Sequence, residues 1–319
     1  MSSLGVGAFG EIRQWIYRNA RPVDFTRWQY HFESGNGDSV AKALAAYQNQ
    51  DGGFGHALDG GSWNPNSSPR TAAAAVRILR EVNLYSYSHP VVMRLLVYLS
   101  MTPYYNAYGW PLSIPSDWEH PHAAWVECEG NEDSFALTGY LVGYILRCGS
   151  AHNPFYAEAE ILAKSMIGKL YYQKALDSWE LASYCSLLED IRAADLMQQF
   201  DGERFLRRLH MVVSATIQGG MAADTPSVAS LPLACIPSPE SPLYEGNEKI
   251  VSRALDTLIK ARQPGGIWDI PVAWGGYAQT SVIGGRWQQA DLAIRNVLLL
   301  KSYGRLIPTV MREDPGQAT

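Results

Sequence analysis

The sequence predicts an all-α protein, a double-layered α/α barrel (an α/α toroid) with five to six helical hairpins in a single domain spanning residues 1–319. Three observations predict this fold class. The alternation of apolar and polar residues that marks strands is hardly present. Helical segments with one apolar stripe take turns along the chain with segments that are apolar or small on nearly every side. A glycine-rich stretch that follows one helix also recurs weakly later, as in repeat architectures.

The segments with one apolar stripe are expected to form the outer layer. In residues 203–217, Phe205, Leu209 and Val213 share one face of a helix, while Arg204 and Arg207 lie mostly elsewhere. Such a helix buries one face and leaves the other in water. We expect outer helices at residues 38–48, 90–100, 155–171, 203–217 and 247–262.

The segments that are apolar nearly all round are expected to form the inner layer, because such a helix must be covered on most sides. Examples are TAAAAVRIL (71–79), FALTGYLVGYIL (135–146) and WELASYCSLL (179–188). The stretch 218–246 is rich in Pro and Ser, so a short inner helix near 227–235 or a loop is expected there. We expect the other inner helices at residues 69–82, 133–147, 178–191 and 286–303.

The stretch YQNQDGGFGH (47–56) lies between an outer and an inner helix, and LIKARQPGGIWDIP (258–271) resembles it. Gly52 and Gly53 provide backbone conformations that end a helix. The aromatic residue after them is expected to pack between neighbouring repeats, and the Gln and Asp side chains can bond helix-terminal groups. We interpret the stretch mainly as a structural staple.

Composition and charge restrict the classes of partner. The chain of 319 residues is 47% hydrophobic and 18% charged, so it can bury a large core. Its net charge of -5 comes from interspersed acids and bases without a Lys/Arg block, which argues against nucleic acid as a partner. Neither a P-loop nor G-x-G-x-x-G nor G-x-S-x-G occurs, so no nucleotide site or hydrolase elbow is expected. No cofactor and no metal are expected.

The cysteines and the apolar runs indicate in which cellular compartment the protein is expected. Cys128, Cys148, Cys185 and Cys235 form no CxxC pair, which fits reduced structural thiols. The N-terminus lacks a basic region followed by an apolar core, so no signal peptide is expected. The most apolar run, 135–146, is too short for the roughly 20 residues that cross a bilayer. A cytoplasmic protein is expected, and its oligomeric state stays open.

The stretch Gln48 to Gly55, QNQDGGFG, together with GGIW at 265–268, resembles the QW-type repeat (Q-x-x-x-G-x-W) of squalene-hopene cyclases and of the related protein prenyltransferase β subunits. The superfamily has an α/α barrel, so the resemblance covers most of the chain at the level of architecture. It implies a central cavity lined by aromatic residues, in which a hydrophobic isoprenoid substrate is folded and cyclised through carbocations. Such a substrate leaves peripheral membrane contact open as a route of uptake.

In the cyclases of this superfamily an Asp-rich motif, D-x-D-D-T-A, supplies the proton. The most similar stretch here is GNEDSFAL, in which Glu132 and Asp133 match two acids and Ser134 matches the Thr, while Gly130 and Phe135 depart from the motif. The resemblance implies Asp133 as the proton donor, with Glu132 tuning it. Burial beside an apolar helix would raise the pKa of Asp133. Alternatively, these residues simply cap helix 133–147.

The stretch DWEHPHAAWVECE (117–129) gathers acids and histidines in a loop before that helix. His120 and His122 are candidates for proton transfer, with His122 tuning the acid, and metal ligation or structural hydrogen bonding are the alternatives. Trp125 in the same loop is a candidate for the cavity wall. Such a long loop is expected at the barrel mouth.

Two further stretches supply candidates. In HALDGGSWNPNSSPRTA (56–72), Asp59 is a catalytic candidate and His56 and Trp63 are substrate-binding candidates. The helix that starts near Ser67 could receive an anion at its first amides, helped by Arg70, or the stretch is a polar cap. In residues 268–287 the candidates for substrate binding, with ordinary core packing as the alternative, are Asp269, Trp274, Tyr277 and Trp287.

The leading hypothesis is a small isoprenoid cyclase that works by acid-initiated carbocation chemistry. A glycan lyase or hydrolase on the same barrel is the alternative, with Asp59, Glu119 and Asp269 as acid and base. A third hypothesis is a non-catalytic binding or scaffold domain that lost the acid motif. The cavity distinguishes them, because an isoprenoid requires a dry aromatic pocket, a glycan an open acidic groove, and a scaffold none.

Overall fold

The computed structural model describes residues 2–127, 135–150, 153–173, 176–219, 226–270 and 277–307. The protein is all-helical in these ranges, as predicted, and contains isolated bridges but no strand there. Across the same ranges, no helix combines the length and the apolar character that crossing a membrane requires. In these ranges the buried apolar side chains form a core to which every described α-helix contributes.

The elements follow one another as helices and two short 3₁₀ turns. In chain order they are α1 (Val6–Asn19), α2 (Pro22–Phe32), α3 (Gly37–Ala45), α4 (Pro69–Glu81), α5 (Pro90–Met101), η1 (Pro115–Glu119), η2 (Ala124–Glu127), α6 (Thr138–Arg147), α7 (Tyr156–Leu170), α8 (Ser178–Ala193), α9 (Gly202–Gly219), α10 (Pro226–Cys235), α11 (Glu248–Lys260) and α12 (Ala278–Ser302).

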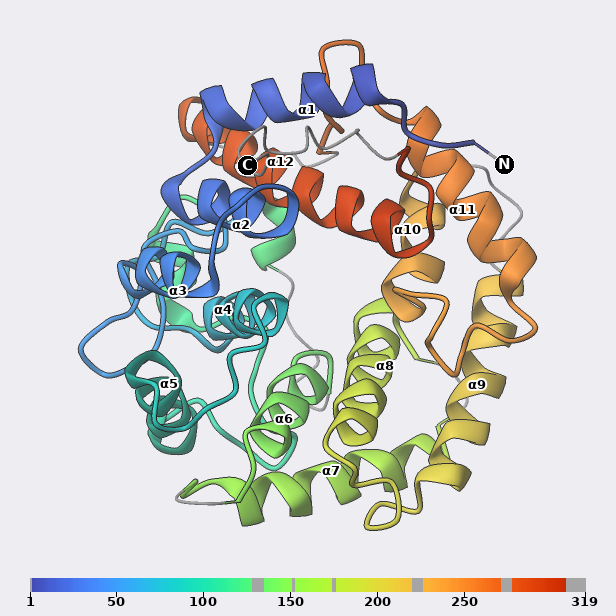
Figure 1. Cartoon of the computed structure of the whole chain (residues 1–319). Coiled ribbons are helices and arrows are strands. Elements are labelled where there is room, and N and C mark those ends of the chain that lie inside the picture. Colours follow the sequence, from blue (N-terminus) through green and yellow to red (C-terminus); the bar gives the residue numbers. More distant parts are fainter. Residues whose placement is uncertain are drawn as a thin grey trace, which may run out of the picture.

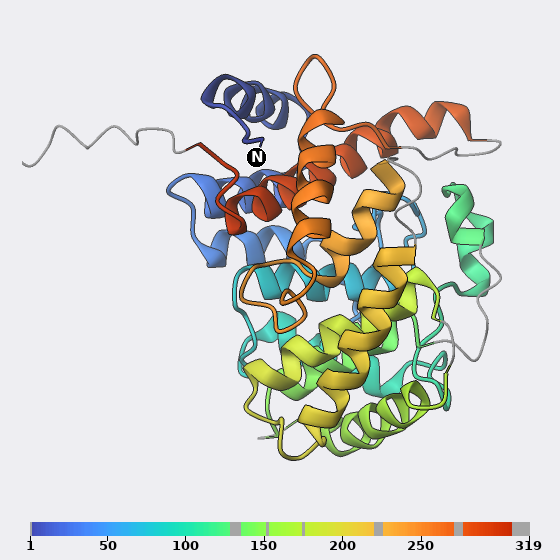
Figure 2. The same cartoon turned by 90° about the vertical axis from the view of Figure 1, so that its right-hand side faces the viewer.

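The helices alternate between two positions. In Figure 1, α3, α5, α7, α9 and α11 lie at the periphery, whereas α4, α6, α8, α10 and α12 lie nearer the centre. Helix α6 packs against α4, α7 and α8, and α8 packs against α9 and α10. Helix α12 packs against α1 and α2, which brings the last helix to the first two. The view in Figure 2 shows η1 and η2 standing apart on one side of the helices.

The two ends of the described chain are joined. The Leu4 amide donates to the Arg305 carbonyl at 2.7 Å, and the Ile307 amide donates to the Leu4 carbonyl at 3.1 Å. After α12, the Tyr303 hydroxyl donates to the carbonyl of Ile236, which follows α10, at 2.7 Å. Arg305 also forms an ion pair of 2.9 Å with Asp256 of α11. These contacts fasten the end of α12 to α10, to α11 and to the N-terminal segment.

Most of the predicted helices are present, but α1 and α2 were not predicted. Helix α1 buries only Ile12 and Ile16 within itself, so its apolar stripe is too narrow to be recognised. Helix α2 buries Asp24 and Arg27 beside Val23, so charges interrupt its buried face. The short inner helix expected near 227–235 is α10, and α12 begins eight residues before the expected 286.

The stretch QNQDGGFGH is a staple between helices, as interpreted from the sequence. The Asn49 amide donates to the Gly53 carbonyl at 2.9 Å, and the Gly52 amide donates back to the Asn49 carbonyl at 3.0 Å. The Gln48 side chain donates to the Gly52 carbonyl at 2.9 Å and to the Val91 carbonyl at 3.0 Å, which ties the turn to the first turn of α5. Phe54 is fully buried.

The weak repeat in the sequence corresponds to a repeated turn. After α11, the Gln263 amide donates to the Ile267 carbonyl at 2.9 Å, and the Gly266 amide donates to the Gln263 carbonyl at 3.1 Å. Trp268 takes the place of Phe54, and its indole N–H donates to the Leu258 carbonyl in α11 at 2.7 Å. The two turns are therefore equivalent, and each seats a buried aromatic ring after a peripheral helix.

Replacing Gly52 with alanine is expected to lower the free energy of unfolding by about 2 kcal/mol. Gly52 has a φ of +92°, and a Cβ there would lie 2.2 Å from the Arg94 carbonyl oxygen. Gly168→Ala is the matched control, because that glycine lies in α7 with no atom within 4 Å of its Cβ position. Urea unfolding of both variants checks this. A Gly52→Ala protein as stable as Gly168→Ala would contradict the turn geometry.

Candidate functional site

A cavity of about 950 Å³ lies between the more central helices. Its wall is formed by one face each of α4, α6, α8 and α12, by the end of α10, and by the loops that carry Asp59, Leu112 and Trp125. Residues far apart in the sequence therefore meet around one space. A volume of this size lies within the range of small-molecule sites in proteins.

The face that α4 turns to the cavity alternates small and cationic residues. Arg70, Ala73, Ala74, Arg77 and Arg80 all line it, and their spacing of three and four residues places them on one side of the helix. The two alanines leave room for a ligand. The arginines border that room along the whole length of the helix.

The other helices add charges from their middle and later turns. Helix α6 contributes Tyr140 and Arg147, and helix α12 contributes Asp291 and Arg295. Helices α6 and α8 run side by side in the same direction, because the Gly139 amide donates to the Ser183 hydroxyl at 2.9 Å near their starts. Further along the same pair, Arg147 approaches Asp190. The last turns of these helices therefore lie at a common end of the cavity.

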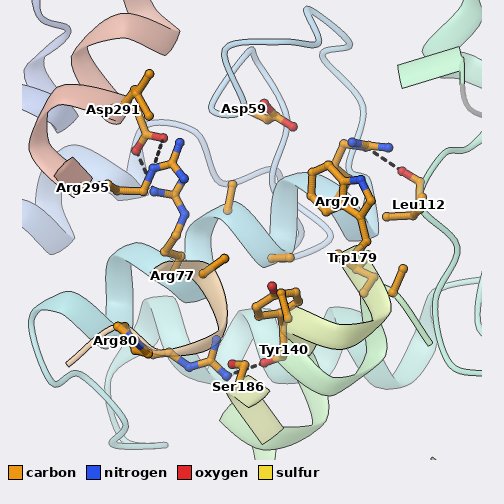
Figure 3. Close-up of a pocket in the computed structure, with 18 of the residues that line it drawn as sticks. Asp59, Arg70, Arg77, Arg80, Leu112, Tyr140, Trp179, Ser186, Asp291 and Arg295 are labelled. Atoms are coloured by element: carbon orange, nitrogen blue, oxygen red, sulfur yellow. Dashed lines mark hydrogen bonds and ion pairs between the residues drawn. The ribbon is translucent and has the colours of Figure 1, made fainter. Parts of the chain in front are cut away.

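One group of charges centres on Asp291 and is visible in Figure 3. The Asp291 carboxylate accepts from Arg77 at 2.7 Å and from Arg27 at 2.8 Å, and it forms an ion pair of 3.1 Å with Arg295. We call these four residues the Asp291 group. One carboxylate from α12 thus binds three guanidinium groups that come from α2, α4 and α12.

Arg27 links this group to the protein interior. Its side chain is fully buried and also binds Asp24 at 2.9 Å and Glu81 at 2.7 Å. Asp24 in turn binds Arg21 at 2.8 Å, and the Arg21 side chain donates to the carbonyl of Leu58 at 3.2 Å. The network fixes the cavity wall, because α2, α4, α12 and the loop at residue 58 share it.

The pKa shifts in the Asp291 group reflect close contact between buried opposite charges. Burial acts to raise the pKa of Asp291, but Arg77, Arg295 and Arg27 outweigh burial and hold this pKa well below its usual value. Burial lowers the pKa of Arg295, and repulsion from Arg77 and Arg27 opposes the attraction of Asp291. Burial also acts to lower the pKa of Arg27 and of Arg77, but the neighbouring carboxylates outweigh it and raise both pKa values.

A second group of charges centres on Asp190 of α8. Arg80 forms an ion pair with this carboxylate and donates to the Tyr140 carbonyl at 2.6 Å. Arg147 lies 3.5 Å from Asp190 and stacks on the Tyr85 ring at 4.0 Å. We call Arg80, Arg147 and Asp190 the Asp190 group. Here too, arginines outnumber the carboxylate between them.

The end of the cavity at the first turns of α4 and α8 combines aromatic and apolar residues with one arginine, Arg70. Arg70 in the first turn of α4 stacks on Trp125 at 4.8 Å and donates to the Leu112 carbonyl at 2.7 Å. Trp179 in the first turn of α8 lines the same region and is half-exposed, and Figure 3 shows it near Arg70. Asp59 lies in a loop above the helices, between Asp291 and Arg70, in Figure 3. Arginines therefore line the cavity along the whole of α4, and aromatic rings lie at the first turns of α4 and α8.

The cavity wall as a whole carries more positive than negative charge. Among the described lining residues, six are arginines and four are acids. One of the acids, Glu189, forms an ion pair of 3.0 Å with Arg192 and accepts from the Ser241 hydroxyl at 2.8 Å. Two lining side chains also present buried polar atoms without a hydrogen-bond partner, the Arg80 Nε donor and the Gln288 Oε1 acceptor. Such atoms are costly unless a ligand or water binds them.

The loop candidates from the sequence occupy different places. Asp59 and Trp125 line the cavity. His122 is buried, and its Nδ1 donates to the His120 carbonyl oxygen at 2.6 Å, so the proton lies on Nδ1. The His122 ring also lies 5.5 Å from the ring of Tyr277. His120 is half-buried and does not line the cavity.

The remaining candidates lie beside the cavity or away from it. Trp63 and Trp287 stack on each other at 5.1 Å, and Arg21, a lining residue, lies 5.4 Å from the Trp287 ring. His56 is exposed and bonds the Asn49 side chain at 2.8 Å, and Glu119 and Asp269 are exposed and do not line the cavity. The carboxylates of the glycan hypothesis are therefore not assembled around it. Glu132, Asp133 and Trp274 lie outside the described residues.

The arginines of the cavity were not identified as site residues from the sequence, apart from Arg70. A signal was present, because Arg77 and Arg80 on α4, Arg147 on α6 and Arg295 on α12 stand in segments that were predicted to be inner helices. A charge on a helix that is covered on all sides must face either a partner or a cavity. Arginines on several inner helices therefore indicate a charged cavity.

The donor set of the site is made of guanidinium groups. In the part of the chain that the structure describes, no three His, Cys, Asp or Glu side chains are grouped to hold a metal ion. Cys148, Cys185 and Cys235 are free thiols, as expected, and Cys185 and Cys235 are buried.

Comparison with known proteins adds no relative, since no protein-family model and no curated protein matches the chain. The geometry of the cavity is therefore the basis for any functional conclusion.

Proposed function

We propose that the chain is a double-layered α/α barrel of the terpenoid cyclase and prenyltransferase type, and that its central cavity binds an anionic amphiphile of the isoprenoid class. The alternation of peripheral and central helices supports the barrel (Figure 1). The packing of α4 on α6, α6 on α8, α8 on α10 and α12 on α2 supports its closure. The QW-like turns at Phe54 and Trp268 support the type of barrel.

The cationic excess of the cavity wall, which includes the Asp291 group and the Asp190 group, carries the proposal. The Asp291 group and the Asp190 group offer guanidinium N–H donors, which bind phosphate and carboxylate well because their planar fork matches two oxygens. Trp125, Trp179 and Leu112 offer an apolar surface at the other end. A ligand with a charged head and a hydrocarbon tail satisfies both ends at once.

Electrostatics favour an anion over a carbocation beside these arginines. Two unit charges about 5 Å apart interact by about 3 kcal/mol at an effective dielectric constant of ~20. For a cationic centre next to the Asp291 group this interaction energy would be repulsive. For an anionic head it would be attractive. Acid-initiated cyclisation therefore fits only the aromatic end, where the chain enters the cavity wall at Ala136, three residues after Asp133.

Calorimetric titration with geranyl monophosphate, and with geraniol as its uncharged counterpart, tests the proposal. The phosphate ester is expected to bind and geraniol to bind at least about 10-fold more weakly, since a charge-assisted hydrogen bond contributes about 1.5–3 kcal/mol. Arg295→Gln is expected to weaken the phosphate ester by about 10-fold. Arg13→Gln is the matched control, because Arg13 pairs with Glu33 and neither residue lines the cavity.

Three outcomes would overturn the proposal. Equal binding of the phosphate ester and geraniol would show that the arginines do not recognise the head. Binding of oligosaccharides in place of both would favour the glycan hypothesis. A cyclised product from a neutral polyprenyl substrate, absent in Asp133→Asn, would favour the acid-initiated cyclase instead.

A further inference from the structure

Two cysteines on different helices lie side by side in the cavity wall. Cys185 belongs to α8 and Cys235 is the last residue of α10, and both line the cavity. Helices α8 and α10 pack against each other, which brings together two positions that are far apart in the sequence. Both side chains are buried free thiols. The anion site proposed for the cavity uses neither of them, so this pair of thiols has no role yet.

The two thiols are in contact. Burial raises the pKa of Cys185 well above its usual value, and the side-chain hydrogen bond between this thiol and Cys235 raises it further. A thiol is a weak donor and a weak acceptor, so the bond forms only where the two sulfur atoms are close. Tyr140 of α6 lies beside both, since burial and then the charges of Cys185 and Cys235 raise its pKa. The raised pKa of Cys185 keeps its thiol protonated at neutral pH, which favours the reduced state.

Both helices are held in place next to the pair. The Tyr184 hydroxyl donates to the Met166 carbonyl of α7 at 2.8 Å, which fixes α8 one residue before its cysteine. The Ile236 carbonyl accepts from the Tyr303 hydroxyl at 2.7 Å, which fixes the chain one residue after the cysteine of α10. The backbone positions on either side of the pair are therefore set by contacts that do not involve sulfur. Rotation of the two side chains is then enough to change the distance between the sulfur atoms.

From this arrangement we infer that Cys185 and Cys235 are a redox pair, which a small uncharged oxidant entering through the cavity converts into a disulfide between α8 and α10. Hydrogen peroxide is such an oxidant. One sulfur attacks the peroxide, breaks its O–O bond and becomes a sulfenic acid as the first water leaves. The second thiol attacks that sulfur, forms the S–S bond and displaces the second water. The thiols lose two electrons and two protons in total, and the peroxide is reduced to two waters.

The disulfide is expected to stabilise the protein reversibly. It joins positions that are distant in the sequence, so it restricts the unfolded chain more than the folded one. The melting temperature Tm of the oxidised protein is expected to exceed that of the reduced protein by about 3–8 °C. Reduction with dithiothreitol should restore the original Tm.

Peptide mapping of the unchanged protein, treated with hydrogen peroxide and digested without reduction, tests the inference directly. The expected product is a pair of peptides that contain Cys185 and Cys235, are linked to each other, and are separated by dithiothreitol. Cys185→Ala and Cys235→Ala are each expected to lose this product and the rise in Tm. Cys148→Ala is the matched control, because Cys148 is a half-buried free thiol that does not line the cavity, and it should retain both.

Access through the cavity is tested with glutathione disulfide, which is large and charged. For each oxidant, the rate on the folded protein is divided by the rate on the protein unfolded in urea, so that the intrinsic reactivity of the oxidant cancels. This ratio is expected to be at least about 10-fold lower for glutathione disulfide than for hydrogen peroxide, because thiol–disulfide exchange requires access to the sulfur.

Three results would overturn the inference. The first is that both thiols of the peroxide-treated protein remain free or carry sulfinic acid without a link between them. The second is a link from either cysteine to Cys128 in place of the expected one. The third is an equal rate ratio for the two oxidants. The peptide map needs no variant, so it decides the question even if an alanine variant does not fold. None of these results affects the proposed anion binding, because a neutral thiol contributes no charge to it.

Discussion

Replacing Arg27 with methionine is expected to lower the free energy of unfolding by about 3–5 kcal/mol. The Arg27 guanidinium is fully buried and binds Asp24 at 2.9 Å, Asp291 at 2.8 Å and Glu81 at 2.7 Å. Methionine has a similar volume, so the packing is largely kept and the charge is lost. All three carboxylates then remain in the interior with one cation fewer, which is the arrangement that makes breaking a buried ion pair costly. Urea unfolding at neutral pH measures the loss.

Arg13→Met is the matched control for Arg27→Met. Arg13 also binds a carboxylate, Glu33, at 2.9 Å, but its side chain is 52% exposed. Exposed ion pairs contribute about 0–1 kcal/mol, because water solvates both partners once they separate. A loss as small for Arg27→Met as for Arg13→Met would show that the buried network does not stabilise the fold in the way the geometry indicates.

The helices that bury an apolar face could be predicted from the sequence, because their apolar residues recur every three or four positions. Helix α9 is an example, because Phe205, Leu209 and Val213 are all buried as the stripe predicts. The repeated turn was also predictable, because Gly52 and Phe54 have counterparts in Gly266 and Trp268. These features depend on neighbouring residues in the chain, so a single sequence contains the information.

Features that depend on distant partners could not be predicted in this way. Helix α2 was missed because Asp24 and Arg27 interrupt its apolar face, and their burial is tolerable only through partners such as Asp291, 264 residues from Arg27. The cavity arginines were missed for the same reason. An analysis of periodicity assigns a charged residue to the solvent-exposed face of its helix. Arg77 instead borders an internal cavity.

The candidate site was predicted in part. Asp59 was selected from the stretch 56–72 and Trp125 from the loop expected at the barrel mouth, and both line the cavity. The expectation of an aromatic cavity holds for one end only, since the other end is made of arginines and carboxylates. Trp63 and Trp287 illustrate the limit of composition, because they stack on each other beside the wall and are not among the residues that line it.

Lowering the pH from about 5 toward 2 is expected to destabilise the protein through Glu81 by about 3 kcal/mol. Burial acts to raise the pKa of Glu81, but Arg27, the hydrogen bond from His31 and the other neighbouring cations lower this pKa from 4.5 to about 2. A carboxyl with a depressed pKa stabilises the fold fully above its unfolded pKa and loses this contribution as the pH falls through its folded pKa. The loss therefore falls between about pH 4.5 and 2, and Asp291, whose pKa is also depressed, adds to it.

The variant Glu81→Gln isolates this contribution, because glutamine keeps the shape of the side chain and does not titrate. Its free energy of unfolding is expected to be lower at pH 7, since Arg27 loses a charged partner, and to fall less steeply below pH 4.5. Glu203→Gln is the control, because Glu203 is exposed in the first turn of α9. Urea unfolding at a series of pH values gives the slopes. Equal slopes below pH 4.5 for the unchanged protein and Glu81→Gln would show that the pKa of Glu81 is the same in the folded and the unfolded chain. The network around Arg27 would then not be the source of acid sensitivity.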